Sequence, residues 1–283
     1  MDITFHSAYI DIRRGSEWLR ISRKHAFYLA DVCADFSHYF DAVEPLELDG
    51  CAFVDFSTPR LHWVKGFKLM PVCFSSLAEP LATANQYLRF ARLQEGDVVM
   101  DLGAYSGLTS MLFAEAAGRT GRVFAFEPDP ASFRITMRNI GHYSELTGKN
   151  NITVYNLAIW EHDQGVDFFS DGNMGARVMV TVSGRHPTCR IPSATLEGFV
   201  RTHALDRIDF VKCDIEGAER VVIPAARGLF ARFKPRLIIE PHFVDGALTA
   251  TTCREALERI GYQVEVTPQA GSTLPLLMAT PAV

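Results

Sequence analysis

Hydrophobic and polar positions become regularly spaced from about residue 81 of this chain onward. Short apolar runs of strand length are separated there by segments with the 3.6-residue spacing of amphipathic helices. The predicted strands are Asp97–Leu102, Arg122–Phe126, Ile152–Tyr155, Ile208–Lys212, Leu237–Ile239, Tyr262–Val266 and Leu274–Ala279. The predicted helices are Leu81–Leu93, Leu108–Ala117, Pro130–Ile140 and Thr252–Ile260. Strands that alternate with helices in this way predict an α/β fold with a mostly parallel sheet covered on both faces.

The segment before residue 81 has a less regular pattern that predicts a mixture of strands and a helix. Parts of Asp2–Ile12 alternate between apolar and polar residues, and Ala52–Phe56 and Trp63–Phe67 have the composition of strands. Within Glu17–Phe40 the apolar residues fit a helical period. We therefore expect an α+β extension here.

These patterns divide the chain into an N-terminal extension, residues 1–80, and a main domain, residues 81–283. Residues 157–200 interrupt the alternation of strands and helices, which predicts an insertion that contains a hairpin. Its stretch DGNMGARVMV has the composition of a turn followed by a strand. We expect the extension to serve as a lid over a site, to pair two subunits in a homodimer, or simply to pack against the main domain.

Composition and charge limit the partners that this chain can have. With 48% hydrophobic residues and a net charge of −5, it resembles an ordinary globular protein and lacks the positive surface that nucleic acid requires. The start, MDITFHSAYIDIRRGSEW, lacks the apolar core of a secretory signal, and no apolar run is long enough to span a membrane. None of the six cysteines forms a CxxC pair. We expect a cytoplasmic protein that binds neither nucleic acid nor membranes.

The first motif is the glycine-containing turn after the strand Asp97–Leu102. It reads Asp101-Leu102-Gly103-Ala104-Tyr105-Ser106-Gly107 and opens the helix that begins at Leu108. The carboxyl end of a strand in such a sheet is where ligands bind, and glycine lets the backbone turn sharply there. The spacing is GxxxG and not the GxGxxG of dinucleotide sites, and the preceding Asp101 favours a ligand with an amino group over a pyrophosphate. The alternative is a strand-to-helix turn whose glycines serve packing alone.

The second motif is an acidic residue that ends the next predicted strand. Glu127 follows RVFAF, stands 20 residues after Gly107, and is followed by Pro128. Nucleoside-binding α/β folds place a carboxylate at this position to accept hydrogen bonds from the ribose hydroxyls. Since both adenosylated and nicotinamide cofactors carry this ribose, the residue indicates a nucleoside without selecting one. The alternative is a solvent-exposed acid at a strand end.

The third motif, DIEGAE, is the most particular. It follows the strand Ile208–Lys212 and delivers Asp214 and Glu216 to the same edge of the sheet, before Gly217 leads into a helix. Two carboxylates at a ligand edge can hold an amino group, orient a hydroxyl or accept its proton. The alternative is that these acids are only N-terminal helix residues favoured by the helix dipole. This explanation fits Glu219 best and Asp214 least.

These motifs together resemble the FkbM family of S-adenosylmethionine (SAM)-dependent methyltransferases. The segment DFVKCDIEGAE is similar to that family's DxxKxDxEGAE, DLGAYSG to its DxGAxxG, FAFEPDP to its FEP segment, and LIIEPH to its fifth-strand segment. The resemblance covers roughly residues 95–245. It implies a Rossmann-like class I methyltransferase fold with a seven-stranded, mostly parallel sheet.

The resemblance also implies a cofactor and an acceptor. SAM is the implied methyl donor, S-adenosylhomocysteine (SAH) the product, and the hydroxyl of a small molecule, such as a sugar or a natural-product intermediate, the acceptor. The positions implied to contact SAM are Asp101, Gly103, Ala104, Tyr105, Gly107, Glu127, Pro128, Asn156, Ala158 and Asp214. Asn156 and Ala158 are included because they follow the third strand, where the fold meets the adenine ring.

Transfer to a hydroxyl requires a group that accepts its proton. Four residues at the carboxyl edge are candidates for this catalytic role: Asp214, Glu216, Glu240 and His242. A histidine with an ordinary pKa near 6.5 can accept a proton at neutral pH, so His242 is one of the candidates, and the alternative is a solvent-exposed or helix-capping histidine. The carboxylates are also hard oxygen ligands suited to magnesium. Nothing in the sequence fixes a ligand set, however, so no metal is predicted.

Two other classes of function remain open from the sequence. A nicotinamide-dependent oxidoreductase shares the fold and Glu127, but it leaves DIEGAE unexplained and requires a GxGxxG turn that is missing. A non-catalytic module that binds SAM shares every motif, although the acids at the strand ends indicate a working site. Whether the protein retains SAM or NAD would distinguish a methyltransferase from the oxidoreductase. Turnover of SAM with an acceptor would distinguish it from the non-catalytic module.

Overall fold

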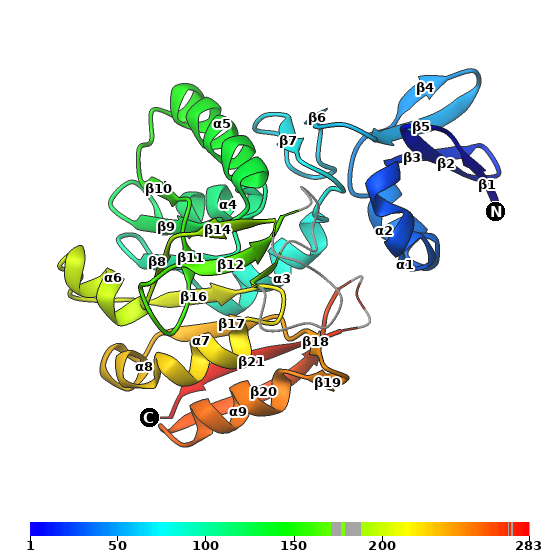
Figure 1. The fold of residues 1–283 in the computed structure, drawn as a ribbon. Helices are drawn as coiled ribbons and strands as arrows, with labels where there is room; N and C mark the ends of the chain where they lie inside the picture. Colours follow the sequence, from blue (N-terminus) through cyan, green and yellow to red (C-terminus); the bar gives the residue numbers. More distant parts are fainter. Residues whose placement is uncertain (171–176, 179–187, 271, 273, 283) are drawn as a thin grey trace.

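A seven-stranded sheet forms the centre of the main domain in the computed structural model, which describes residues 1–170, 177–178, 188–270, 272 and 274–282 (Figure 1). Its strands, in spatial order, are β10 (Ile152–Tyr155), β9 (Arg122–Phe126), β8 (Val98–Leu102), β16 (Phe210–Cys213), β17 (Arg236–Ile239), β21 (Pro275–Pro281) and β20 (Tyr262–Pro268). The first five run parallel, and β21 pairs antiparallel with both of its neighbours. The predicted seven-stranded, mostly parallel sheet is therefore confirmed.

Helices cover both faces of this sheet because its strands are apolar on both sides. The first face is covered by α3 (Leu81–Ala91), α4 (Leu108–Ala117) and α5 (Pro130–Thr147). The second face is covered by α6 (Leu196–Thr202), α7 (Glu219–Ala225), α8 (Arg227–Phe233) and α9 (Ala250–Glu258). Successive strand residues serve opposite faces: Val99 and Phe210 belong to the core under the first group, whereas Val98 and Val211 belong to the core under the second.

Helix α5 shows how local sequence sets an element's ends. The Asp129 side chain accepts hydrogen bonds from the backbone N–H groups of Ala131 and Ser132, and Pro130 occupies the first turn. Gly148 ends the helix in the left-handed conformation. The helix runs to Thr147 and is longer than predicted, because the amphipathic pattern continues beyond Ile140 up to this cap.

The segment between residues 157 and 200 contains short strands outside the main sheet. Strand β12 (Val166–Phe169) pairs antiparallel with both β13 (Arg177–Val178) and β14 (Cys189–Ile191). Two further short strands, β11 (Ala158–Ile159) and β15 (Ser193–Ala194), pair in parallel. Within DGNMGARVMV, the described part is strand β13, and the predicted turn lies outside the described residues.

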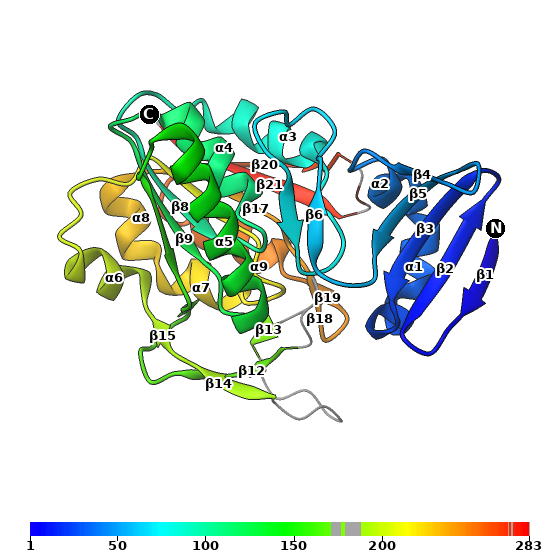
Figure 2. The same cartoon turned by 90° about the horizontal axis from the view of Figure 1, so that it is seen from above.

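The N-terminal module, residues 1–80, contains a five-stranded sheet beside a set of helices (Figures 1 and 2). In spatial order the strands are β1 (Asp2–Phe5), β2 (Tyr9–Arg14), β3 (Glu17–Ser22), β5 (Cys51–Phe56) and β4 (Leu46–Leu48). The helices are the 3₁₀ helix η1 (Arg23–Tyr28), α1 (Leu29–Ala34) and α2 (Phe36–Phe40). A hairpin of β6 (Arg60–His62) and β7 (Val72–Phe74) follows, and the small hairpin of β18 (Phe243–Val244) and β19 (Ala247–Leu248) belongs to the main domain.

Two predictions for this module are wrong. The start of the predicted helix Glu17–Phe40 is strand β3, because Trp18, Leu19 and Ile21 pair across to β2 and bury their side chains there. Trp63–Phe67 is not a strand, and only Val64 makes an isolated bridge, to Val43. Tertiary pairing overrides the local spacing in both places.

The module is joined to the main domain through a continuous hydrophobic core. Phe36 and Phe56 of the module belong to the same buried cluster as Met111 and Ile140 of the main domain. The Asn139 side chain on α5 adds hydrogen bonds to both the N–H and the C=O group of Cys73 on β7, at 3.0 and 2.8 Å. The division at residue 80 stays a prediction, since residues on both sides of it pack together.

Candidate functional site

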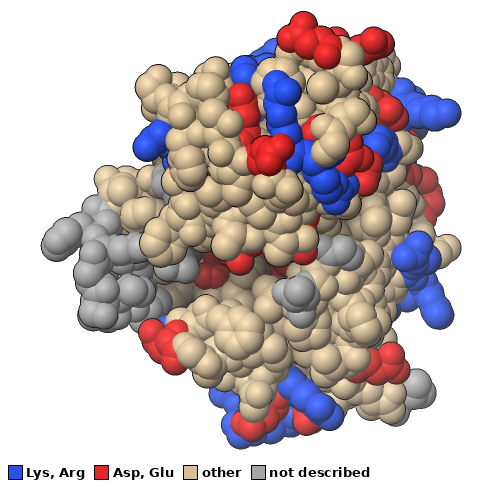
Figure 3. Space-filling model, turned by 90° about the vertical axis from the view of Figure 1, so that its right-hand side faces the viewer, with Lys and Arg blue, Asp and Glu red and all other residues tan. Residues whose placement is uncertain are grey.

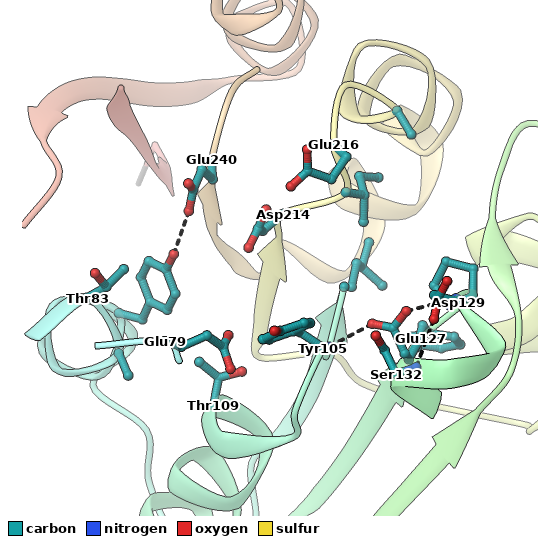
Figure 4. A pocket seen from close by; sticks show the side chains of 18 of the residues that line it. Glu79, Thr83, Tyr105, Thr109, Glu127, Asp129, Ser132, Asp214, Glu216 and Glu240 are labelled. Carbon is teal, nitrogen blue, oxygen red and sulfur yellow. Dashed lines mark hydrogen bonds between the residues drawn. The ribbon is translucent and has the colours of Figure 1, made fainter. Parts of the chain in front are cut away.

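A cavity lies at the carboxyl ends of β8, β9, β16 and β17, where ligands bind in open α/β sheets (Figures 3 and 4). The empty space at this edge is about 1350 Å³, including the part that is open to solvent. The predicted site residues that line it are Gly103, Tyr105, Glu127, Pro128, Ala158, Asp214, Glu216 and Glu240.

The turn after β8 forms the floor of the cavity and depends on glycine for packing. Gly103 has a φ of +83°, and a Cβ built there would lie 1.8 Å from the Asp214 carbonyl oxygen. Gly107 has a φ of +79°, and a Cβ there would press on Thr136 and Ile140. Gly107 and Ala104 do not line the cavity. Their position favours a role in shaping the turn that carries Gly103, and their predicted contact with the cofactor stays a prediction.

Glu127 joins the ends of β8 and β9 at the cavity wall. Its two carboxylate oxygens accept hydrogen bonds from the backbone N–H groups of Tyr105, at 2.7 Å, and of Asp129, at 2.8 Å. Burial raises the pKa of Glu127 to about 8, although the two N–H groups oppose the rise. Each oxygen retains lone pairs that can accept from further donors. A carboxylate held in this way is a fixed acceptor for hydroxyl groups in the cavity.

Asn156 supports the wall and does not line it. Its side-chain amide donates to the carbonyl groups of Glu127 and Pro128, at 2.8 and 2.9 Å. The residues that follow it, Leu157 and Ala158, line the cavity. The donors of Asn156 are used by the backbone that follows β9, so the geometry gives it a supporting role in the wall, and its predicted contact with the adenine stays a prediction.

Asp101 lies beneath the cavity and is fully buried. One carboxylate oxygen accepts hydrogen bonds from the hydroxyls of Thr109, at 3.0 Å, and Ser110, at 2.5 Å. The other lies 3.5 Å from the Nζ atom of Lys212. Asp101 therefore does not contact a ligand's amino group directly, and that prediction is corrected to a supporting role.

Lys212 links the acids beneath and inside the cavity. Its ammonium donates to the Gly103 carbonyl at 2.5 Å and lies 3.3 Å from a carboxylate oxygen of Asp214. Only 1% of the residue is exposed. Burial opposes the charge, but Asp214 and Asp101 together raise the pKa of Lys212, so it remains protonated. The sequence placed this lysine on a strand without indicating its partners.

Glu79 is a site residue that the sequence analysis missed. Its carboxylate lines the cavity (Figure 4). It accepts a hydrogen bond from the Ser106 hydroxyl at 2.5 Å. Burial raises its pKa to about 7, and the charge of Lys212 opposes this rise. Glu79 lines the cavity near the turn, whereas Asp101 lies beneath it. Its position just before α3 carried no motif that pointed to the cavity.

The opposite wall consists of carboxylates from β16 and β17 (Figure 4). Asp214 and Glu216 follow β16, and Glu216 has a left-handed φ of +54°. Glu240 follows β17 and accepts hydrogen bonds from the Tyr87 hydroxyl, at 2.9 Å, and the Gln269 amide, at 2.8 Å. Burial raises the pKa of Glu216 to about 7 and also raises that of Glu240. Groups that hold protons near neutral pH are suited to proton transfer.

His242 stands behind this wall and not in it. Its Nε2 atom lies 3.7 Å from Asp214 and 3.6 Å from Glu216, and its Nδ1 atom lies 3.3 Å from Glu219. Burial opposes the charged form, but these carboxylates raise the pKa of His242 well above its ordinary value. A protonated imidazole cannot accept a proton, which favours a role for His242 in orienting the carboxylates over its predicted role as a base.

Among the described residues, one group has the geometry to hold a metal ion. Single ligand atoms of Asp214, Glu240 and His242 all lie within 4.8 Å of one another. An ion there would compete with the Lys212 ammonium for Asp214 and with a proton for His242. The sequence left a divalent metal possible without predicting one, and this geometry leaves that expectation unchanged.

The fold and the site together define a nucleoside-binding α/β enzyme with an acidic second wall. The sequence profile of the methyltransferase FkbM domain matches residues 101–264. The match covers more than half of the chain, and the protein therefore belongs to the FkbM methyltransferase family, whose cofactor is SAM. The sequence-based assignment to this family is confirmed.

Three solved structures are similar to this chain. A methyltransferase FkbM from Methylobacillus flagellatus shares 18% identity over 69% of this chain, with a TM-score of 0.47. The chain spans 50% of the length of that protein. A SAM-dependent O-methyltransferase from Thermotoga maritima shares 14% identity over 73% of this chain and 66% of its own, with a TM-score of 0.43. Fibrillarin from Aeropyrum pernix, in complex with natively bound SAM, shares 10% sequence identity over 99% of this chain and 98% of its own, with a TM-score of 0.44.

Two searches gave a negative result. No curated protein matches this sequence. Among the described residues, no helix is both long and apolar enough to cross a membrane.

Proposed function

We propose that this protein transfers the methyl group of SAM to a hydroxyl group of a small molecule. The observation that carries the proposal is the pairing of two walls in one cavity: a nucleoside-type wall at Tyr105 and Glu127, and a carboxylate wall at Asp214, Glu216 and Glu240. Membership of the FkbM family supports the donor. The acceptor wall supports a reaction in which a proton must be removed.

The cofactor would lie across the ends of β8 and β9. The Gly103 turn allows the close approach of its methionine part, and Glu127 would accept hydrogen bonds from the ribose hydroxyls. Leu157 and Ala158 form the apolar wall for the adenine. Glu79 would face the amino group of the methionine part, because its carboxylate lines the cavity near the turn.

Glu216 is the residue that we assign as the general base. The acceptor oxygen attacks the methyl carbon in line with the carbon–sulfur bond, whose electron pair returns to sulfur and gives SAH. The hydroxyl proton passes to Glu216, whose pKa of about 7 balances ionisation with proton affinity at neutral pH. Alignment of the reactants contributes in addition to the base. His242 holds the carboxylates of Glu216 and Asp214 in place.

The test is turnover of methyl-labelled SAM with panels of sugars and hydroxylated natural-product intermediates. We expect label to appear in a methyl ether, with one SAH formed for each ether. Glu216→Gln should lower kcat by about 10²–10⁴-fold with little effect on SAH binding, because only the base is lost. Label on nitrogen would contradict O-methylation, and an unchanged kcat in Glu216→Gln would contradict the base assignment.

The two alternatives make different predictions. An oxidoreductase would bind NAD, but the described residues that line the cavity include no lysine or arginine to meet its pyrophosphate. A non-catalytic module would bind SAM without turnover on any acceptor. We favour catalysis because acids with raised pKa values, at Glu216 and Glu240, face the cavity.

The remaining expectations concern the setting of the reaction. We propose a cytoplasmic enzyme of natural-product or sugar modification that acts on a small molecule and not on nucleic acid or membranes. All six cysteines are free, which suits a reducing compartment. The pairing of two chains into a homodimer stays a prediction.

A further inference from the structure

The N-terminal module contributes one side of the cavity. Asp35, at the junction of α1 and α2, and His38 and Tyr39, on α2, line the same space as the carboxylates that end β16 and β17. Figure 3 shows acidic side chains at the bottom of the hollow between the two parts of the molecule. The methyl acceptor therefore contacts the N-terminal module if the methyl donor occupies the floor of the cavity.

The polar groups on this side have no described partners. Among the described residues, none forms a hydrogen bond with the Asp35 carboxylate, the His38 ring or the Tyr39 hydroxyl. Burial and the charges of Asp35 and Asp31 raise the pKa of the Tyr39 hydroxyl to about 12, and Glu216 and Glu240 contribute less to this rise. Burial lowers the pKa of His38, so that this ring is neutral at pH 7. The module thus presents donors and one acid toward the carboxylate wall.

A buried amide on the opposite side is also incompletely paired. Gln269 lines the cavity, is only 8% exposed, and uses its N–H group on Glu240. Its Oε1 atom is buried and accepts no hydrogen bond from the described residues. A buried acceptor without a donor is costly, so this atom indicates a ligand that supplies an N–H or O–H group.

The charge in the cavity selects among such ligands. Seven acidic residues line it: Asp35, Glu79, Glu127, Asp129, Asp214, Glu216 and Glu240. No lysine or arginine among the described residues does so, and Lys212 lies behind the wall, where it is already engaged with Asp101 and Asp214. Phosphate or carboxylate groups on an acceptor would be repelled. A cationic acceptor would neutralise acids that SAM alone leaves unpaired.

We propose that the methyl acceptor is a hydroxylated amine, such as an aminated sugar, whose ammonium group lies between Asp35 of the N-terminal module and Glu240 of the main domain. The proposal rests on the methyltransferase function proposed above and adds the substrate class. Tyr39 and Gln269 would contribute hydrogen bonds to the polar groups of the same molecule, and its reacting hydroxyl would face Glu216.

A shallower hollow beside α2 provides the entrance. It is lined by both parts of the molecule and shares Asp35, His38, Pro80 and Ser272 with the main cavity. On its outer side Lys65 pairs with Asp41 at 2.9 Å, so its cation is already engaged. An acceptor larger than the cavity can therefore extend along α2 while its amine remains among the acids.

The test compares matched amines and amides on the full chain. D-Glucosamine and N-acetyl-D-glucosamine, and an amino alcohol and its N-acetyl derivative, are titrated with and without saturating SAH by NMR. We expect each amine to bind at least about tenfold more tightly than its acetylated partner. Asp35→Asn should weaken amine binding about tenfold and leave SAH binding unchanged. The control is Glu47→Gln, an exposed acid on β4 of the same module, which should change neither.

The outcomes separate this inference from the proposed function. The inference is wrong if no amine binds more tightly than its acetylated partner, or if Asp35→Asn leaves the preference for the amine intact. This holds whether or not SAH binds. If SAH fails to bind, the proposed function is contradicted, and the titration without SAH still decides the charge preference. Loss of the preference as salt is raised would support recognition of charge.

Discussion

Replacement of Lys212 by methionine removes the ammonium group that lies between two carboxylates. The side chain of Asp101 is 0% exposed, and that of Lys212 2%. The loss of one partner from a buried ion pair typically costs about 3–5 kcal/mol, because the remaining charge is left without compensation. We expect Lys212→Met to lower the free energy of unfolding by this amount, measured by urea denaturation near neutral pH.

The matched control is Lys65→Met, which breaks an exposed pair with Asp41. Its lysine side chain is 37% exposed and its aspartate side chain 57%, so the pair contributes at most about 1 kcal/mol.

The pKa of Lys212 is raised, so its contribution to stability is lost only as the pH rises above the usual range of measurement. Addition of Asp101→Asn to the Lys212→Met variant should restore part of the lost stability, because it removes the charge that Lys212→Met leaves unpaired.

The result that would refute this reasoning is a Lys212→Met variant as stable as the Lys65→Met control. The Asp101–Lys212–Asp214 arrangement would then not be an energetic unit of the fold. A loss of stability without recovery in the double variant would point to lost packing of the lysine stem and not to charge.

Three further predictions follow from the same geometry. Gly103→Ala should lower the stability of the fold by more than the roughly 1–2 kcal/mol that a left-handed φ costs, because its Cβ would also meet the Asp214 carbonyl. Gly141→Ala in helix α5 is the control and should be neutral or stabilising, and thermal unfolding compares the two variants. The turnover rate should rise with pH through about 7, because the base form of Glu216 is the ionised one and its pKa is raised to that value; a pH profile that falls there would contradict the assignment. Treatment with a chelator should leave turnover unchanged, because the Lys212 ammonium already pairs with Asp214 and a proton occupies His242, two of the three ligands that an ion would need; loss of activity restored by magnesium would show the opposite.

The main sheet could be predicted from sequence because its strands are buried on both faces. Strands such as β8 and β9 therefore appear as continuous apolar runs that end in an acid or a glycine. The motifs also marked the correct edge, since the carboxyl ends of parallel strands meet there. Glu127, Asp214, Glu216 and Glu240 all line the cavity.

Other parts of the site depend on packing between distant segments and could not be predicted. Whether a strand-end acid points into the cavity or beneath it depends on its neighbours. Asp101 accepts hydrogen bonds from hydroxyls of α4, and Glu79 lines the cavity instead. His242 appeared to be a base by its ordinary pKa, but surrounding carboxylates keep it charged. Tyr39 comes from a module whose packing no local pattern records.

The most direct test of the account is calorimetric titration of the protein with SAM, SAH and NAD. Glu127→Gln is compared with Glu145→Gln, an exposed acid on α5. We predict that SAM and SAH bind, that NAD does not, that Glu127→Gln weakens binding of both adenosyl ligands by at least about tenfold, and that the control binds normally. Binding of NAD alone, or unchanged SAH binding in Glu127→Gln, would contradict the placement of the cofactor on which the account rests.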